Sequence, residues 1–573
     1  MKTIIQRVCL PLFYCFALLA IVNCGPPELK LAIQSPIAIQ PAHVVRMRIV
    51  PLSVLQGGDS QALAGLQKVV GKAEAGVSLD ALSFDCDSLL KSIKNQPTNL
   101  YPDTAAFLLV ELFEDTQKEA DGVSAPIASG HAPLNVACQT LAARVVLSAP
   151  GSLTSWRVGG KELALPRVGH SVTSLPDGSL LISGGAQQIA FDLANGLFGI
   201  TTSGTAAKTL LYSPSTDTYT ELEALDTVFH SATLLGSQVL LLGGQTLDGK
   251  IASSNIVNYN NNEQTWQLST PQETTETFFQ KVDQRVLALR PAADANRLLF
   301  PVGGVCVGRA ISECAKEEAQ IRLFTASALE GADKVSQGVV LAGGLAYSTA
   351  ETAFVTNKHL WYFSMADISG GNIQISASGS NAFALQKPRA GHSVSVLDKD
   401  NVLVVGGAYA QKGTSNLEFR ELHNTAELCS RAGGKWDCRL LTDADFYSDV
   451  TFRSSGARVQ HTATKLLDNR IVFVGGYSKL TGGPPAFNDD VLLLQYTKQD
   501  NTFTFCLQRL ESGNPLAKRA WHTSTLLTTG QLLFVGGIEN GDTSGSFKAV
   551  EPVGLFHPPP AISSLSAETC KAK

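Results

Sequence analysis

A short apolar run that ends on two adjacent glycines is repeated seven times along this chain of 573 residues. The glycine pairs are 184–185, 243–244, 303–304, 343–344, 406–407, 475–476 and 536–537, at spacings of 40 to 69 residues. In the first copy, a β-type segment and a turn at Pro176–Gly178 precede the apolar run, which is the pattern of a β-hairpin. A unit of this size cannot bury its faces alone and must pack against further copies of itself. The sequence therefore predicts an all-β repeat array.

Polar residues recur in register with the glycine pairs. Five units carry a histidine, followed by Ser or Thr, 13 or 14 residues before the first glycine: His170, His230, His392, His461 and His522. Four of these have an arginine three residues earlier: Arg167, Arg389, Arg458 and Arg519. Spaced aromatics follow downstream, seven residues apart, at Tyr212 and Tyr219 and at Tyr259 and Trp266, and Cys429 with Trp436 occupies the same place.

This combination resembles the kelch repeat, as in the central domain of galactose oxidase, in which about 50 residues build one four-stranded blade of a β-propeller. The resemblance implies a kelch propeller over 143–560 with seven blades, or six if the units at Gly303 and Gly343 share one. It also implies that strands from both ends of the propeller share a blade. Arg144–Val158 would complete the blade begun at 518–560, which removes an open sheet edge.

The N-terminus predicts export. Lys2 and Arg7 precede an apolar core at Val8–Val22, which suits a signal peptide over 1–23. The following residues resemble a bacterial lipobox, which implies lipidation of Cys24 and a lipid-attached tether over 24–40. Gly25 favours the outer membrane or cell surface by resemblance to sorted lipoproteins, and a periplasmic or plainly secreted protein is the alternative. No later segment is apolar enough to span a membrane, so the lipid would be the anchor.

Eight of the 11 cysteines follow Cys24, an even number that suits an oxidising compartment. Neighbours in sequence suggest the disulfides Cys86–Cys138, Cys306–Cys314, Cys429–Cys438 and Cys506–Cys570. The sequence contains no CxxC spacing and no His–Cys cluster, so we predict no metal site and no cofactor.

A separate small β-rich, sandwich-like domain is expected over 41–142. Its expected strands are Val44–Leu55, Ala105–Glu114 and Ala142–Ser148, and apolar spacing favours a helix within Asp59–Ala75. A C-terminal tail is expected over 561–573.

Loop lengths predict where recognition occurs. In a four-stranded meander, the loops between second and third strands share one face with the crossings between blades, and here these are the long ones. That face would carry Tyr409, Tyr447 and Tyr477, which are candidate ligand-binding residues together with the four repeat arginines. The structural alternative is that the tyrosines pack the insertions and that the arginines bond neighbouring loops. For the arginines we favour that alternative.

Composition narrows the function. The net charge is −5 and no basic block occurs, so nucleic acid is not an expected partner. We expect an envelope binding or scaffold lipoprotein that recognises a glycan or a protein through the long-loop face. The alternative is a carbohydrate-active enzyme, similar to epimerases or oxidases, that uses the axial mouth. No catalytic residue is assigned.

Overall fold

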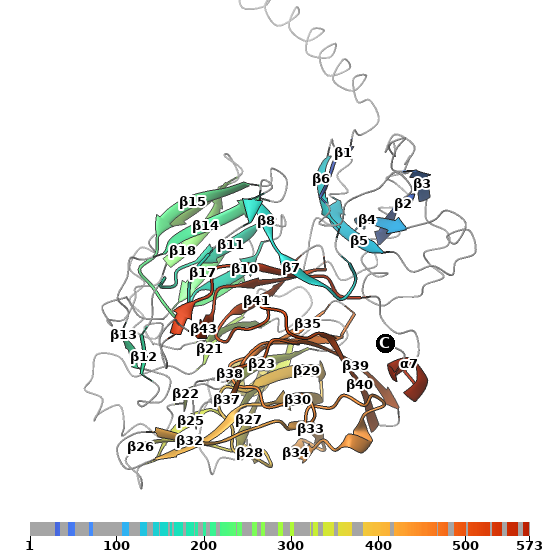
Figure 1. Ribbon diagram of the computed structural model, residues 1–573. Helices are drawn as coiled ribbons and strands as arrows, with labels where there is room; N and C mark the ends of the chain where they lie inside the picture. The colour runs from blue at the N-terminus through green and yellow to red at the C-terminus, as the bar shows by residue number, and fades with distance from the viewer. Residues whose placement is uncertain are drawn as a thin grey trace, which may run out of the picture. The chain divides into compact units, whose positions relative to one another are not determined.

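The computed structural model divides the chain into two units, Met1–Ala149 and Pro150–Lys573, each of which is described by itself. In the first unit the structure describes residues 29–34, 44–51, 68–72, 106–113, 127–134 and 141–147. From 149 to 571 it describes the chain with gaps, of which the longest are 243–254, 270–284, 303–320 and 370–381. The described elements are almost entirely strands (Figure 1), which confirms the all-β class.

The first unit contains a four-stranded antiparallel sheet in the order β3-β2-β4-β5. Its strands are β2 (Val44–Pro51), β3 (Lys68–Lys72), β4 (Ala106–Phe113) and β5 (Ala128–Leu134). A second pair joins β1 (Leu29–Gln34) to β6 (Leu141–Val146) in parallel.

One expectation for this unit needs correction. Lys68–Lys72 is a strand within the segment expected to be helical, because it pairs along β2. Leu29–Gln34, within the segment 24–40 expected to be a tether, pairs with β6. The first unit ends at Ala149 and includes β6.

The second unit contains six four-stranded antiparallel sheets among its described residues, and in five of them the chain runs from each strand to the adjacent one. We name each sheet by its first strand. The first two are β10 (Ser171–Ser174), β11 (Leu180–Ser183), β14 (Lys208–Ser213) and β15 (Thr218–Ala224), then β16 (Ser231–Leu235), β17 (Gln238–Leu242), β18 (Asn255–Asn260) and β19 (Thr265–Ser269). The next is β23 (Thr325–Glu330), β24 (Ser336–Ala342), β27 (His359–Ser364) and β28 (Ala382–Ala384).

The remaining sheets continue the pattern. They are β29 (Ser393–Asp398), β30 (Asn401–Val405), β33 (Ala426–Ala432) and β34 (Lys435–Leu440), and β35 (Thr462–Lys465), β36 (Ile471–Val474), β39 (Val491–Gln499) and β40 (Thr502–Glu511). The last combines β41 (Thr523–Leu526), β42 (Leu532–Val535) and β45 (Gly554–Phe556) with β7 (Leu153–Ser155). Between the β16 and β23 sheets lies a pair, β20 (Arg285–Leu289) with β21 (Leu298–Val302).

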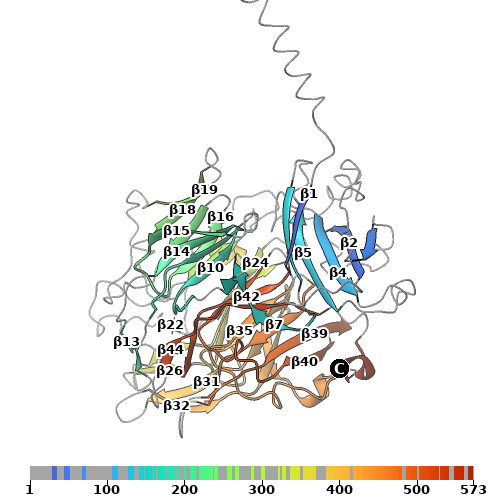
Figure 2. The ribbon, with the colours of Figure 1, turned by 45° about the horizontal axis from the view of Figure 1, so that its top comes forward.

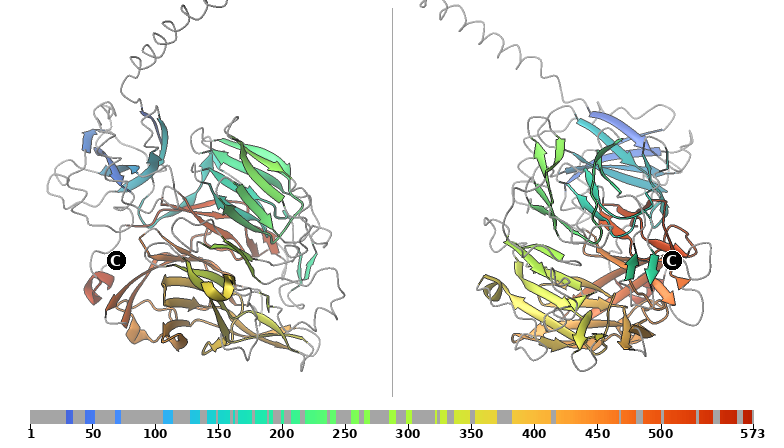
Figure 3. Two further views of the ribbon diagram at one scale, coloured as in Figure 1. Left: turned by 180° about the vertical axis from the view of Figure 1, so that it is seen from behind. Right: turned by 90° about the vertical axis from the view of Figure 1, so that its left-hand side faces the viewer.

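The first strands contact one another in a closed order: β10, β16, β20, β23, β29, β35, β41 and again β10. Figure 2 shows β10, β35 and β42 near the middle of this unit, with β15, β19 and β40 toward its outside. The closing sheet takes its fourth strand from the start of the unit, because β7 pairs with β45 from Leu153↔Phe556 to Ser155↔Gly554. This strand lies inside the segment expected to complete the last sheet. Figure 3 shows the same sheets from two further directions.

Short hairpins follow the second strands. They are β12 (Ala190–Asp192) with β13 (Gly199–Thr201), β25 (Leu345–Ser348) with β26 (Ala353–Thr356), β31 (Ala408–Lys412) with β32 (Leu417–Leu422), β37 (Tyr477–Lys479) with β38 (Ala486–Phe487), and β43 (Ile538–Asn540) with β44 (Phe547–Ala549). β22 (Ile321–Arg322) also pairs with β25. The residue after a glycine pair bridges to the residue two before a repeat histidine, as in Val168↔Ala186 and Val459↔Tyr477. The hairpins are thereby fastened beside the starts of the first strands.

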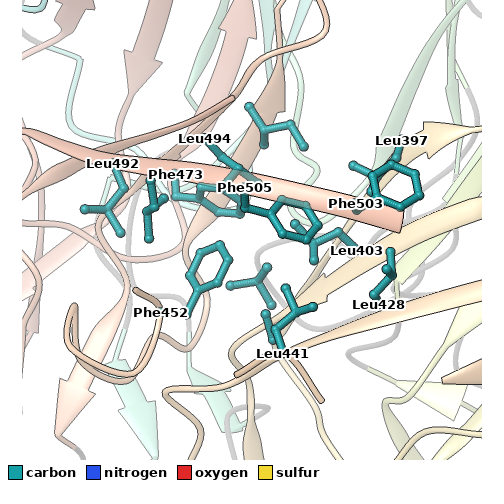
Figure 4. Packing of buried hydrophobic residues seen from close by; sticks show 14 residues of the cluster. Leu397, Leu403, Leu428, Leu441, Phe452, Phe473, Leu492, Leu494, Phe503 and Phe505 are labelled. Atoms are coloured by element: carbon teal, nitrogen blue, oxygen red, sulfur yellow. The ribbon is translucent and has the colours of Figure 1, made fainter. Parts of the chain in front are cut away.

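Adjacent sheets pack through apolar side chains. In Figure 4, Leu397, Leu403 and Leu428 of the β29 sheet face Phe473, Phe503 and Phe505 of the β35 sheet. Each fully buried side chain of this kind contributes about 1.5–3 kcal/mol through removal from water. The apolar run that ends on each glycine pair therefore supplies the core between sheets.

Two of the expected disulfides are confirmed. Cys429 bonds Cys438 across β33 and β34, and Cys506 in β40 bonds Cys570 in the helix α7 (Ala567–Lys571), which ties the expected tail to β40 (Figure 1). Cys429 lies opposite Cys438, and Trp436 lies opposite Arg431. Cys24 and the other two expected pairs lie outside the described residues. No helix among the described residues is long and apolar enough to cross a membrane.

Candidate functional site

The glycine pairs and the repeat histidines form one packing unit. A β-carbon added to the first glycine would lie against the histidine of a neighbouring sheet, 2.7 Å from Cε1 of His230 at Gly184 and 2.8 Å from Cε1 of His170 at Gly536. A β-carbon added to the second glycine would meet the histidine of its own sheet, 2.8 Å from Cβ of His170 at Gly185. Both glycines also have a positive φ, 60° at Gly184 and 93° at Gly185, which favours glycine. The recurring motif is therefore set by the fit of each imidazole ring between two sheets.

The four repeat arginines are buried beneath this layer. Each Nη1 donates to the carbonyl of the first glycine in its own sheet, and the distances are 3.2 Å for Arg167–Gly184, 2.6 Å for Arg389–Gly406, 3.3 Å for Arg458–Gly475 and 3.0 Å for Arg519–Gly536. Arg389 also pairs with Glu427 and Arg458 with Asp490, both at 2.6 Å. None is more than 5% exposed. These guanidinium groups hold the sheets together, which is the structural role that we set beside ligand binding.

The imidazoles are joined to neighbouring first strands by hydroxyl groups. The Nε2 atom lies 2.9 Å from Thr523 Oγ1 at His170, 2.9 Å from Ser171 Oγ at His230, 2.8 Å from Ser393 Oγ at His461 and 2.8 Å from Thr462 Oγ1 at His522. Each of these hydroxyls belongs to the residue that follows the histidine of the adjacent sheet. The Ser and Thr that follow each histidine in the sequence motif are therefore the hydrogen-bond partners of the histidine in an adjacent sheet.

His392 interrupts this pattern. Neither ring nitrogen has a hydrogen-bond partner among the described residues, although the side chain is buried, with 7% exposed. The neighbouring β23 sheet begins at Thr325 and has no repeat histidine before it, and the Thr325 hydroxyl donates to the backbone carbonyl of His392 at 3.0 Å. The Nε2 atom of His392 therefore lacks the hydroxyl partner that it has in the other four repeat histidines.

A cavity of about 400 Å³ lies among the starts of the first strands. All five repeat histidines line it, together with hydroxyl residues such as Thr325 and Thr523. Its described lining holds no carboxylate, lysine or arginine. The lining also includes Phe229, Gln460 and Trp521, each of which directly precedes a repeat histidine.

Those three residues have a left-handed backbone. φ is 58° at Phe229, 55° at Gln460 and 60° at Trp521, whereas glycine occupies the same place at Gly169 and Gly391. A left-handed conformation costs an L-residue about 1–2 kcal/mol. Backbone hydrogen bonds hold them: Phe229 N–H donates to Gly169, and Gln460 N–H to Gly391, at 2.6 and 2.8 Å. The Phe229 and Trp521 rings meet edge to face at 5.9 Å.

The histidines are neutral near pH 7. Burial lowers the pKa of His230 to about 4, and burial together with the charge of Arg458 lowers the pKa of His461 to about 3. Burial also holds the pKa of His392 well below its usual value, with a further contribution from Arg389. The imidazoles therefore act as hydrogen-bonding groups and not as cations.

The three candidate tyrosines are not brought together at the cavity. The Tyr409 hydroxyl donates to Gln411 Oε1 at 2.9 Å on β31, and Tyr447 is exposed beyond the short helix at Asp443–Asp445. Tyr477 is fully buried and its ring lies 4.9 Å from Phe487, so it packs the β37–β38 hairpin. The sequence did not point to Phe229, Gln460 and Trp521. They are distinguished by a left-handed backbone at the position before the histidine, which is visible only in the structure.

A further group of ligand type, Glu427 with Cys429 and Cys438, does not offer a metal site because both sulfurs are in the disulfide. No protein-family model matches the sequence, and no curated protein is significantly similar to it.

Proposed function

We propose that the second unit is a seven-bladed kelch-type β-propeller. The closed order of seven first strands supports this interpretation, as does the closing sheet built from both ends of the unit. In this interpretation the β20–β21 pair belongs to the third blade and the cavity lies at one mouth of the central channel.

The chain would act as an exported, lipid-anchored envelope protein that binds a glycan or a protein partner at this mouth and the hairpins round it. The observation that carries the proposal is the cavity, which is lined by neutral hydrogen-bonding groups and by aromatic rings held in a strained backbone. Strained residues persist where the surrounding structure holds them, and they gather at binding sites. Neutral hydroxyl, imidazole and amide groups beside aromatic rings suit binding more than acid–base catalysis.

Binding of the purified full chain to glycan and peptidoglycan arrays tests this function. A reproducible hit that Trp521→Gly weakens would support recognition at the mouth, since glycine suits the backbone at 521. Arrays without a hit, together with envelope crosslinking that captures no specific partner, would contradict it.

The membrane attachment needs a separate test. Cys24→Ser should move the chain from the membrane fraction to the soluble fraction, because the substitution removes the thioether site. Unchanged retention in the membrane would contradict lipidation at Cys24. Cys9→Ser, which lies within the expected signal peptide, is the matched control and should leave the fractionation as it is.

A further inference from the structure

We propose that His392 and Gln460 form a subsite in this cavity that recognises a hydroxyl group of a neutral saccharide, an inference that rests on the binding function proposed above.

The first half of the subsite is the imidazole of His392. Its Nδ1 edge faces the end of β24, since a β-carbon on Gly343 would lie 3.2 Å from Nδ1. Neither Nδ1 nor Nε2 has a hydrogen-bond partner among the described residues, so the neutral ring offers one donor and one acceptor whichever nitrogen carries the proton. An unpaired buried polar atom costs free energy, so a ligand group that can both donate and accept a hydrogen bond is favoured here.

The second half is an amide donor. The side-chain Nε2 of Gln460 also has no hydrogen-bond partner among the described residues. It lies over Gly391, the neighbour of His392, because a β-carbon on Gly391 would be 3.0 Å from this nitrogen. An unpartnered imidazole and an unpartnered amide donor that line the same cavity complement a hydroxyl group, which both donates and accepts.

The same chemistry disfavours an anion. The described lining holds no lysine or arginine that would balance the charge of a carboxylate, sulfate or phosphate, and the guanidinium of Arg389 is already bonded to Gly406 and Glu427. Protonation of His392 would change this preference, but its pKa lies well below neutrality.

The rest of the cavity suits a sugar ring. Trp521 and Phe229 provide aromatic surface next to Gln460, and the backbone N–H of Trp521 donates to the backbone carbonyl of Gln460 at 3.2 Å. Aromatic faces pack on the apolar face of a ring whose hydroxyls point elsewhere. The volume of about 400 Å³ lies within the range of small-ligand sites.

Calorimetric titration of the full chain tests the subsite. The neutral probes are D-galactose, D-mannose, N-acetyl-D-glucosamine and their β-linked disaccharides, and D-galacturonate and N-acetylneuraminate are the anionic probes. We expect saturable binding of at least one neutral probe, with the anionic counterpart at least tenfold weaker.

Gln460→Gly separates recognition from folding. Because φ at 460 is 55°, glycine removes the amide and relieves the backbone, so the variant should melt no lower than the parent while its affinity falls at least tenfold. His392→Phe should also lose at least tenfold. Asn469→Gly is the matched control, since Asn469 is left-handed but does not line the cavity, and it should bind as the parent does.

The outcomes are separable. An array hit that Gln460→Gly leaves unchanged would overturn the subsite but keep the binding function, and so would tighter binding of the anionic probes. Loss of affinity in Gln460→Gly without a lower melting temperature would support the subsite. Absence of binding to every probe and to every array feature would overturn both proposals.

Discussion

Gly406→Ala tests the interlock between glycine pairs and histidines. The backbone at Gly406 has a φ of 67°, which costs an L-residue about 1–2 kcal/mol. The added β-carbon would also lie 2.3 Å from the Arg458 carbonyl oxygen and 3.1 Å from Cε1 of His461. Overpacking of this kind destabilises the fold by a further ~1–3 kcal/mol. We therefore expect the free energy of unfolding to fall by about 2–5 kcal/mol.

Gly433→Ala is the matched control for this experiment. Its φ is 58°, but a β-carbon there would meet no atom within 4 Å, so only the conformational cost of about 1–2 kcal/mol applies. Urea unfolding monitored by tryptophan fluorescence gives both values from the shift of the midpoint. Equal destabilisation by the two substitutions would refute the interlock, because it would leave only the backbone term.

Three further predictions concern stability. The buried histidines have folded pKa values below the unfolded value near 6.5, about 4 for His230 and about 3 for His461, so the unfolded chain binds more protons below pH 6.5. Stability should thus be full above pH 6.5 and fall by up to ~1.4 kcal/mol per pH unit for each such histidine as the pH drops toward 4. A urea midpoint that stays constant from pH 7 to 4.5 would contradict this. The double variant Cys506→Ser/Cys570→Ser opens a 64-residue loop and should cost ~4 kcal/mol, against ~2–3 kcal/mol for Cys429→Ser/Cys438→Ser, whose loop spans 9 residues. Similar losses from the two pairs would argue against the chain-entropy explanation. Asp490→Asn should destabilise by about 3–5 kcal/mol because Arg458, 1% exposed, would keep an unpaired charge; Asp443→Asn, on the surface, is the control and should be neutral.

The sequence predicted the sheets well because each depends on a local pattern. The apolar run before Gly406 became β30, and β10 pairs antiparallel with β11 as the hairpin pattern indicated. Tyr212 and Tyr219, seven residues apart, lie directly opposite across β14 and β15. The helix expected near Asp59 was less secure, since spacing of Leu and Val over a few residues does not distinguish a helix from a strand paired along β2.

The candidate site was harder to predict because it depends on contacts between units far apart in sequence. The bond from His170 to Thr523 joins residues 353 positions apart, and no local pattern names that partner. In the sequence, the arginines could equally bind an anion or a backbone carbonyl. Their burial and their hydrogen bonds to the glycine carbonyls are visible only in the fold. Nothing in the sequence distinguishes the cavity residue Gln460, because its backbone angle and its unpartnered amide exist only in the fold.

The proposed subsite follows from a break in the repeat. Where a unit and its neighbour both carry the histidine and the hydroxyl, Nε2 of the imidazole bonds that hydroxyl, as His522 does with Thr462. The β23 unit lacks the histidine, the hydroxyl of Thr325 donates to the His392 backbone, and neither ring nitrogen of His392 has a partner among the described residues. Gln460, in the unit that follows, takes a place that glycine fills in two other units, despite its backbone cost. Glycine at 460 would relieve that cost, whereas an amide that lines the same cavity as His392 is what the proposed recognition of a hydroxyl requires.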